Sequence, residues 1–215
     1  MQVAIAGGHG KIAVHLTELL VERGDQVRSL IRNPDHAAEV EELGATSVVC
    51  DLESGDTDAV AEAVGSVDAI VFAAGAGPGS GPDRKETMDY GGAAKLIAAA
   101  KLNGVSRYVI VSSMGADPDR EGDEDFDVYL KAKGRADAEL AESGLDYTIV
   151  RPGGLTDDSA TGAVELGETG RGEIPRGDVA AILAATLTGP TTVGMTFEAI
   201  GGDTPIDEAV RGLAE

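Results

Sequence analysis

Short apolar runs alternate with longer segments of helical periodicity through most of the 215-residue chain. This alternation indicates strand–helix–strand units and a parallel sheet, because a parallel strand needs a long crossover to reach its neighbour. Strands are expected at residues 2–6, 26–31, 47–50, 68–72, 107–111, 147–150 and 195–200. Helices are expected at residues 11–23, 57–64, 87–102, 128–142 and 178–187, with a short last helix near the end of the chain. The sequence therefore predicts an α/β fold in which helices flank a mainly parallel, doubly wound sheet of about seven strands.

One domain is expected over residues 1–215. The length suits one substantial domain and is short for two, and the sequence contains neither a repeat nor a linker. Aromatic residues make up only 3% of the chain, so the core must be built from Ala, Val, Ile and Leu. No window approaches roughly 18 consecutive apolar residues, and no charged-then-apolar leader precedes the first strand. A soluble, cytoplasmic protein without a membrane partner is expected.

The formal net charge is −21, with 38 acidic residues against 17 basic ones spread along the chain. Such a field repels nucleic acids and anionic membrane surfaces, so neither is an expected partner. An acidic surface with few lysines is also typical of proteins from a salt-rich cytoplasm, where salt screens the self-repulsion. A halophilic source is therefore expected, with an ordinary acidic cytosolic protein as the alternative. The single cysteine, Cys50, excludes an internal disulfide and a cysteine-based metal cage, and no metal site is expected.

A glycine-rich turn follows the first expected strand at residues 7–10 and leads directly into the first helix. Gly7 permits the tight turn, Gly10 lets backbone approach a pyrophosphate, and Ala13 is small enough for close packing of the helix on the strand. The phosphates would lie at the positive N-terminus of the helix. This context predicts a Rossmann-like dinucleotide-binding site. The cofactor-binding residues expected at the turn are Gly7, His9, Gly10, Lys11 and Ile12.

The end of the second expected strand indicates which dinucleotide binds. Enzymes that use NAD usually carry Asp or Glu there for the ribose 2′-hydroxyl, whereas this chain has Arg32 just beyond the strand. A cation at this position favours the 2′-phosphate of NADP(H), and Lys11 in the first helical turn would add a second charge. The alternative is that Arg32 is a solvent-facing residue at a strand end. The expected cofactor is NADP(H).

Further cofactor contacts are expected at the ends of the third and fourth strands, where ligands bind in doubly wound folds. Asp51, followed by Leu52, offers a carboxylate that would accept a hydrogen bond from the adenine amino group. The small residues Ala73, Ala74 and Gly75 would form a floor for the adenosine half.

Two long loops, residues 74–85 and 115–127, leave the same edge of the expected sheet. Loops of this length at a ligand-binding edge are expected to form walls or lids over a substrate. The second loop is rich in acidic residues, so a plain solvated loop is the alternative there.

The fifth expected strand ends in Ser112 and Ser113, and the following helix carries Tyr129 and Lys133 in a Tyr-x-x-x-Lys spacing. Residues four apart share one helix face, so the phenol and the ammonium would be neighbours. An ammonium lowers the pKa of a neighbouring phenol from about 10, which makes Tyr129 a candidate proton donor or acceptor near neutral pH. Ser113 would hydrogen-bond the substrate oxygen that Tyr129 protonates. The predicted catalytic residues are Ser113, Tyr129 and Lys133, with Ser112 and Lys133 also at the cofactor.

These motifs resemble those of the atypical short-chain dehydrogenase/reductases, in particular the compact NAD(P)H-binding group described as NAD(P)-dependent epimerases. The likeness covers essentially the whole chain. The motifs that carry it are Gly7-x-x-Gly10-x-x-Ala13, Val27-Arg28-x-Leu30-x-Arg32-Asn33-Pro34, Asp51-Leu52, Asp89-Tyr90-x-Gly92-Ala93, Val111-Ser112-Ser113, Tyr129-x-x-x-Lys133, Ser143-Gly144-Leu145-Asp146-Tyr147-Thr148-Ile149-Val150-Arg151-Pro152-Gly153 and Arg176-x-Asp178-Val179-Ala180.

The resemblance implies roles that the residue pattern alone does not give. It implies that Pro152 and Gly153 lie beside the nicotinamide and that Lys133 also reaches the cofactor ribose. Asp89 falls where typical members of the superfamily carry the Asn of a catalytic tetrad, which is a departure from their pattern.

The expected function is that of an NADP(H)-dependent oxidoreductase acting on a small carbonyl or hydroxyl compound, sugar-like ones included. The first alternative is a non-catalytic, NADP(H)-responsive regulatory or binding protein, because many members of the group lack the catalytic residues. Weaker alternatives are a flavin or quinone reductase and a sugar epimerase. The sequence does not choose the substrate, and it leaves open whether the protein is a monomer or a homodimer.

Overall fold

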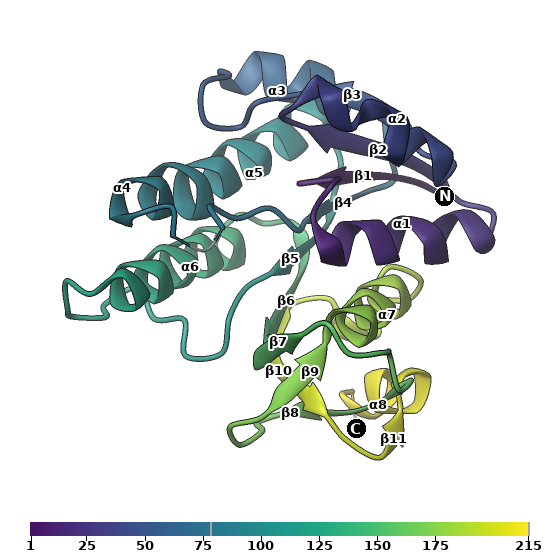
Figure 1. The fold of residues 1–215 in the computed structure, drawn as a ribbon, viewed down its shortest axis with the longest axis vertical. Helices are drawn as coiled ribbons and strands as arrows, with labels where there is room; N and C mark the ends of the chain where they lie inside the picture. Colours follow the sequence, from purple (N-terminus) through teal and green to yellow (C-terminus); the bar gives the residue numbers. More distant parts are fainter. Residues whose placement is uncertain (78, 215) are drawn as a thin grey trace.

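The computed structural model describes every residue except Pro78 and Glu215 (Figure 1). Its sheet contains seven parallel strands, each at one of the positions expected from the apolar runs. In spatial order they are β3 (Thr46–Val49), β2 (Gln26–Ile31), β1 (Gln2–Ala6), β4 (Ala69–Phe72), β5 (Arg107–Val111), β6 (Asp146–Pro152) and β10 (Met195–Gly201). The strand order turns back between β1 and β4, which is the switch point of a Rossmann fold. The predicted doubly wound α/β fold is confirmed.

Four short strands in the last third of the chain were not expected. Strands β8 (Ala163–Gly167) and β11 (Thr204–Pro205) pair antiparallel at the β10 edge and bring the main sheet to nine strands. Strands β7 (Gly154–Thr156) and β9 (Glu173–Pro175) form a separate parallel pair. Only β8 exceeds three residues, so the sequence of these strands carries little periodic signal.

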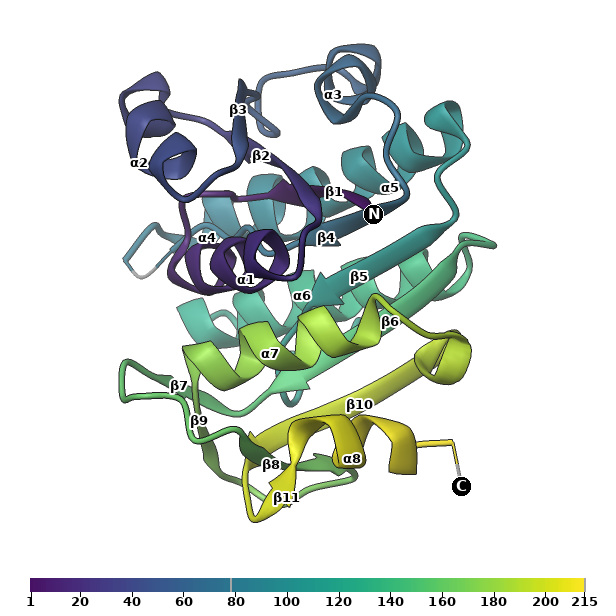
Figure 2. The same ribbon diagram turned by 90° about the vertical axis from the view of Figure 1, so that its right-hand side faces the viewer.

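Helices cover both faces of the sheet. One layer contains α1 (Lys11–Glu22), α2 (Ala37–Glu42), α7 (Arg176–Thr186) and α8 (Ile206–Gly212), and Figure 2 shows α1 and α7 side by side over the strands. The opposite layer contains α3 (Thr57–Val64), α5 (Gly91–Asn103) and α6 (Asp125–Ala141). None of the helices in the described part of the chain is long and apolar enough to cross a membrane.

Strand β1 shows how the sheet divides the core into two. Val3 and Ile5 face the α1 and α7 layer, whereas Ala4 and Ala6 face the α3 and α5 layer, because successive side chains of a strand point to opposite faces. All four side chains are fully buried. A strand buried on both faces reads as a continuous apolar run, which is the pattern that the sequence presents here.

The helix expected at residues 87–102 has a more complex start. A single turn, α4 (Pro82–Arg84), leads into a π-helix over Lys85–Tyr90, and the chain continues as α5. A π-helix has more than four residues per turn, so Lys85 and Asp89 come to one side, and both are buried. Short π-helices of this kind are frequent at functional sites.

Candidate active site

The turns after β1 and β4 meet at the switch point, where glycine and alanine residues leave the backbone accessible to a ligand. Gly7 has a φ of +79°, and a Cβ on it would lie 2.7 Å from the Cα of Ala74, so only glycine fits. Gly10 is the N-cap of α1, and its N–H donates to the carbonyl oxygen of Gly7 over 2.7 Å. Free N–H groups of a helix start and a turn without side chains fit a pyrophosphate.

Gly8, which we did not single out from the sequence, is also required by packing. A Cβ on Gly8 would lie 2.6 Å from the Cβ of Ser29 on β2, and the N–H of Gly8 donates to the carbonyl oxygen of Leu30 over 3.0 Å. The turn is therefore pinned against both neighbouring strands, β2 and β4. A rigid turn of this kind keeps its geometry when a ligand binds.

A pocket of about 310 Å³ lies on the β2 side of the turn, and we call it the Arg32 pocket. Its lining includes most of the residues predicted to bind cofactor on this side. Those residues are Gly7, His9, Gly10, Arg32, Asp51, Leu52, Ala73, Ala74 and Gly75. The imidazole rings of His9 and His36 stack with their centroids 3.6 Å apart along the same wall.

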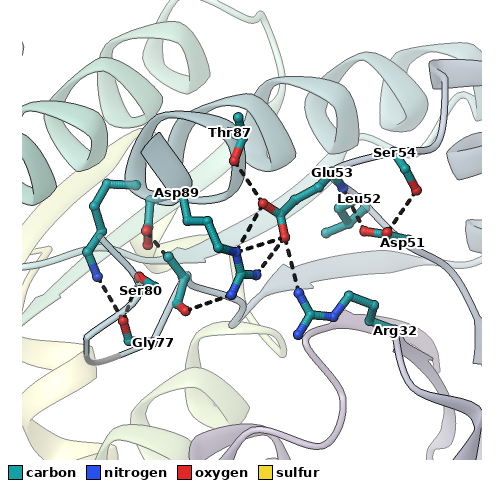
Figure 3. Close-up of polar contacts among 12 residues, drawn as sticks. Arg32, Asp51, Leu52, Glu53, Ser54, Gly77, Ser80, Thr87 and Asp89 are labelled. Atoms are coloured by element: carbon teal, nitrogen blue, oxygen red, sulfur yellow. Dashed lines mark hydrogen bonds and ion pairs between the residues drawn. The ribbon is translucent and has the colours of Figure 1, made fainter. Parts of the chain in front are cut away.

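Arg32 belongs to a cluster of charged side chains at the rim of this pocket (Figure 3). Its Nη1 donates to Glu53 Oε2 over 3.1 Å, and Arg84 Nη2 donates to the same oxygen over 2.5 Å. The hydrogen bond from Arg84 lowers the pKa of Glu53, and the hydroxyl of Thr87 and the charge of Arg32 act in the same direction. Arg84 also lines the pocket, so two guanidinium groups border the place expected for a 2′-phosphate. We had not predicted Arg84 or Glu53.

Asp51 turns its carboxylate towards its own loop. Its Oδ1 accepts the backbone N–H of Glu53 over 2.9 Å, and its Oδ2 accepts the hydroxyl of Ser54 over 2.7 Å. Burial raises the pKa of Asp51, but these hydrogen bonds and the charge of Arg32 outweigh burial and leave it lowered. The carboxylate thus shapes the loop that holds Glu53 while still lining the pocket.

Lys11 does not lie where we expected it. Its Nζ donates to Asp157 Oδ2 over 2.5 Å, and Arg176 Nη1 donates to the other oxygen over 2.6 Å. Lys11 lines a surface hollow beside α7 and is absent from the described lining of the Arg32 pocket. The structure thus gives no support to a second charge from Lys11 at the 2′-phosphate, because its ammonium group is paired with Asp157, and that role stays a prediction.

A second pocket, of about 460 Å³, continues from the Arg32 pocket across Ala73, Ala74 and Gly75, which line both. We call it the Tyr129 pocket. Its other lining residues in the described part of the chain are Ile12, Gly77, Gly79, Lys85, Asp89, Val111, Ser112, Asp125, Phe126, Tyr129, Lys133, Leu155 and Arg176. Both pockets lie at the carboxyl ends of the parallel strands, which is where a dinucleotide spans a Rossmann fold.

Tyr129 and Lys133 meet in this second pocket. Lys133 Nζ lies 6.0 Å from the centroid of the Tyr129 ring and donates to the carbonyl oxygen of Val111 over 2.9 Å. The same nitrogen lies 3.6 Å from Asp89 Oδ1, and both side chains are almost completely buried. Asp89 Oδ2 accepts the backbone N–H of Ala76 over 3.2 Å. Asp89 thus connects Lys133 to the glycine-rich loop after β4.

The two serines at the end of β5 lie differently from the prediction. Ser112 lines the Tyr129 pocket, whereas Ser113 is absent from its described lining and its hydroxyl donates to the carbonyl oxygen of Met114 over 3.3 Å. Consecutive side chains of extended backbone point in opposite directions, so only one of the pair reaches the pocket. The geometry therefore gives no support to the catalytic role predicted for Ser113.

Ser112 is held by a buried polar network behind the pocket. Its hydroxyl donates to Asp137 Oδ2 over 2.7 Å, and Arg151 Nε donates to the same oxygen over 2.9 Å. Burial raises the pKa of Asp137, although the hydrogen bond from Ser112 and the charge of Arg151 oppose that shift. This network joins the end of β5 and α6, which carry the catalytic candidates, to Arg151 on β6.

Pro152 and Gly153 lie behind the pocket wall. The carbonyl oxygen of Pro152 accepts the N–H of Met114 over 3.0 Å, and a Cβ on Gly153 would lie 2.3 Å from the carbonyl oxygen of Gly172. Neither residue is in the described lining of the Tyr129 pocket, which Leu155 of β7 reaches instead. Their expected contact with nicotinamide stays a prediction.

The fold and the paired pockets define a Rossmann-type dinucleotide-binding protein. A family model described as NAD(P)H-binding matches residues 7–190. The chain belongs to this family, the NAD(P)H-binding atypical short-chain dehydrogenase/reductases, as the motifs predicted. Its members are oxidoreductases or epimerases of this type.

Three proteins are similar to this chain in sequence or in structure. It is 38% identical over 215 residues to an uncharacterised sugar epimerase of Bacillus subtilis, covering 99% of this chain and all of the relative. It is 40% identical, with a TM-score of 0.90 and 99% of both chains covered, to a provisionally assigned NAD-dependent epimerase/dehydratase of Bacillus halodurans. An anaerobilin reductase of Escherichia coli is 26% identical, with a TM-score of 0.79 over 94% of this chain and 98% of that one.

Proposed function

We propose that this protein is an NADP(H)-dependent oxidoreductase that acts on a carbonyl group or the corresponding alcohol. The observation that carries the proposal is the meeting of Tyr129 and Lys133 in a pocket continuous with the dinucleotide crevice. A protein that only sensed the cofactor could use Lys133 to bind it, but it would have no need of the phenol of Tyr129 at that place.

In this mechanism, one set of residues binds the cofactor and another transfers a proton to or from the substrate. The glycine turn and the start of α1 would hold the pyrophosphate, and Ala73, Ala74 and Gly75 would form the floor for the adenosine half. NADP(H), when bound, supplies or accepts the hydride. Tyr129 donates a proton to the substrate oxygen, or takes it back in the reverse direction. Lys133 is positioned by Asp89 and the Val111 carbonyl, and its ammonium group lies beside the ring of Tyr129.

A preference for NADP(H) over NAD(H) rests on Arg32 and Arg84. Both guanidinium groups border the Arg32 pocket, and Glu53 holds them there. Arginine matches the geometry of phosphate oxygens and retains its charge at any physiological pH. The carboxylate that typically binds the 2′-hydroxyl of NAD is missing from the end of β2, where Ile31 is followed by Arg32 and Asn33.

Reduction is favoured over sugar epimerisation by one comparison. The Escherichia coli relative that is 26% identical to this chain is an anaerobilin reductase, whereas the Bacillus relatives carry epimerase descriptions without a stated substrate. We therefore propose carbonyl reduction as the direction to test first.

The test follows NADPH oxidation at 340 nm with methylglyoxal, 4-nitrobenzaldehyde and 9,10-phenanthrenequinone as probes. Tyr129→Phe removes only the hydroxyl, so we expect turnover to fall about 10²–10⁴-fold while NADPH affinity stays within a few-fold. Lys133→Ala is expected to lower both turnover and NADPH affinity, because this ammonium also borders the cofactor crevice. Wild-type protein that binds NADPH tightly but oxidises it with none of the probes would favour the regulatory alternative. Full activity of Tyr129→Phe would remove Tyr129 from the mechanism.

A further inference from the structure

Lys85 is a buried lysine in the Tyr129 pocket that neither the motifs nor the proposed mechanism uses. It opens the π-helix Lys85–Tyr90 and is only 9% exposed. Its Nζ lies 5.6 Å from the centroid of the Tyr129 ring. The chain contains six lysines, and two of them, Lys85 and Lys133, line this single pocket.

The charge of Lys85 has no counter-ion in the described part of the chain. The one hydrogen bond that its Nζ makes there goes to the carbonyl oxygen of Gly77, over 2.8 Å (Figure 3 labels Gly77). No ion pair of the described residues includes it, although the chain has 38 acidic residues. Burying a charge without a partner is costly, and an ammonium has three donors, of which one is used here.

The other two cations of the pocket differ from Lys85 in this respect. Lys133 is paired with Asp89, and Arg176 is paired with Asp157. Asp125, the remaining charged residue of the lining, is exposed at the first turn of α6, where water screens it. Lys85 is therefore the cation of this lining that has no ion-pair partner among the described residues, and it lies next to Tyr129, where it can balance a negative charge of a ligand.

Apolar side chains border the same pocket. Phe126 is 61% exposed, and its ring centroid lies 6.0 Å from that of Tyr129 in a stacked arrangement. Leu155, from β7, is 37% exposed and also lines the pocket. In a chain with 3% aromatic residues, an exposed ring beside a catalytic tyrosine offers a platform for an apolar or flat group.

We propose that Lys85 binds a carboxylate of the substrate, and that the substrates are carbonyl compounds in which a carboxylate lies close to the reacting carbonyl group of an apolar body. The inference rests on the proposed function and names the substrate class for the same site. A carboxylate fits better than a phosphate ester, because one ammonium without an ion-pair partner balances one charge and not two, and Arg176 of the same lining is already paired with Asp157.

The experiment measures binding to the NADP⁺-saturated protein by titration calorimetry, so it does not depend on turnover. The probes are phenylglyoxylate, its neutral methyl ester, and phenyl phosphate as a dianion. The variants are Lys85→Arg, which keeps the charge, and Lys85→Gln, which keeps a donor for the Gly77 carbonyl but removes the charge. Lys131→Gln, on the exposed side of α6, is the matched control.

We expect wild type, Lys85→Arg and Lys131→Gln to bind phenylglyoxylate about tenfold to a hundredfold more tightly than the ester, the range of a charge-assisted hydrogen bond. Lys85→Gln should lose that preference and leave the affinities for the ester and for NADP⁺ unchanged. Equal binding of acid and ester by wild type, a preference retained by Lys85→Gln, or tighter binding of phenyl phosphate would each overturn the inference while NADP⁺ binding persists. Failure to bind NADP⁺ would instead overturn the proposed function.

Discussion

Replacing Arg32 with alanine is expected to reduce the affinity for NADPH about twofold to ninefold and to leave the affinity for NADH almost unchanged. A charge-assisted hydrogen bond to phosphate contributes about 1.5–3 kcal/mol. The side chain of Arg32 is 58% exposed, so solvent screening places the contribution at the lower end of that range. Binding must also replace the contact with Glu53, an exposed ion pair that contributes about 0.2–1 kcal/mol. The difference is about 0.5–1.3 kcal/mol, which corresponds to the fold-change given above.

The same arithmetic predicts the opposite result for Glu53→Gln. Glutamine keeps an oxygen for Arg84 and Thr87 but removes the negative charge that competes with a 2′-phosphate for Arg32. We expect NADPH to bind up to about fivefold more tightly, because the ion pair of about 0.2–1 kcal/mol no longer has to be replaced. The affinity for NADH should not rise.

Calorimetric titration with both nucleotides at low and high salt measures these effects. Arg211→Ala, an exposed arginine on α8, is the matched control for the loss of one positive charge. The NADPH advantage of the wild type should shrink as KCl screens the charges. A wild type that binds NADPH and NADH equally, or an Arg32→Ala variant with the full NADPH advantage, would refute the reasoning.

Two further predictions concern stability. Asp137→Ala leaves the Ser112 hydroxyl and part of the Arg151 guanidinium without an acceptor, so chemical denaturation should show a loss of about 3 kcal/mol; an unchanged midpoint would mean that water replaces Asp137 at no cost. The net charge of −21 opposes compaction at low ionic strength, so the melting temperature should rise steeply with KCl into the molar range, with sucrose as the control for solute exclusion. A melting temperature that is flat between about 0.05 and 2 M KCl would contradict this, since the Debye length falls from about 30 Å at 0.01 M to about 3 Å at 1 M.

Local patterns in the sequence were enough to predict the parallel sheet and the phosphate-binding turn. A strand segment buried on both faces must be apolar, as residues 3–6 and 109–111 are, and a turn with a φ of +79° at Gly7 requires glycine. The spacing of Tyr129 and Lys133 likewise follows from helix geometry alone, because residues four apart share a face. These features depend on few neighbours, so a single sequence reports them.

Only the tertiary structure decided which side chains meet in the pockets. Whether Ser112 or Ser113 reaches Tyr129 depends on the direction of one side chain at a strand end, which no residue pattern encodes. Lys11 pairs with Asp157, a residue 146 positions away, and its partner therefore depends on how the loop after β7 is folded.

The π-helix over Lys85–Tyr90 shows most clearly which features the local sequence determines and which depend on tertiary packing. Helical periodicity predicted a helix near these residues, but it did not predict that the backbone over Lys85–Tyr90 is wound as a π-helix with Lys85 and Asp89 buried. A local sequence determines that such a segment is helical, whereas the packing around it determines how the backbone is wound. The position of Lys85 beside Tyr129, without an ion-pair partner among the described residues, is likewise visible only in the folded chain.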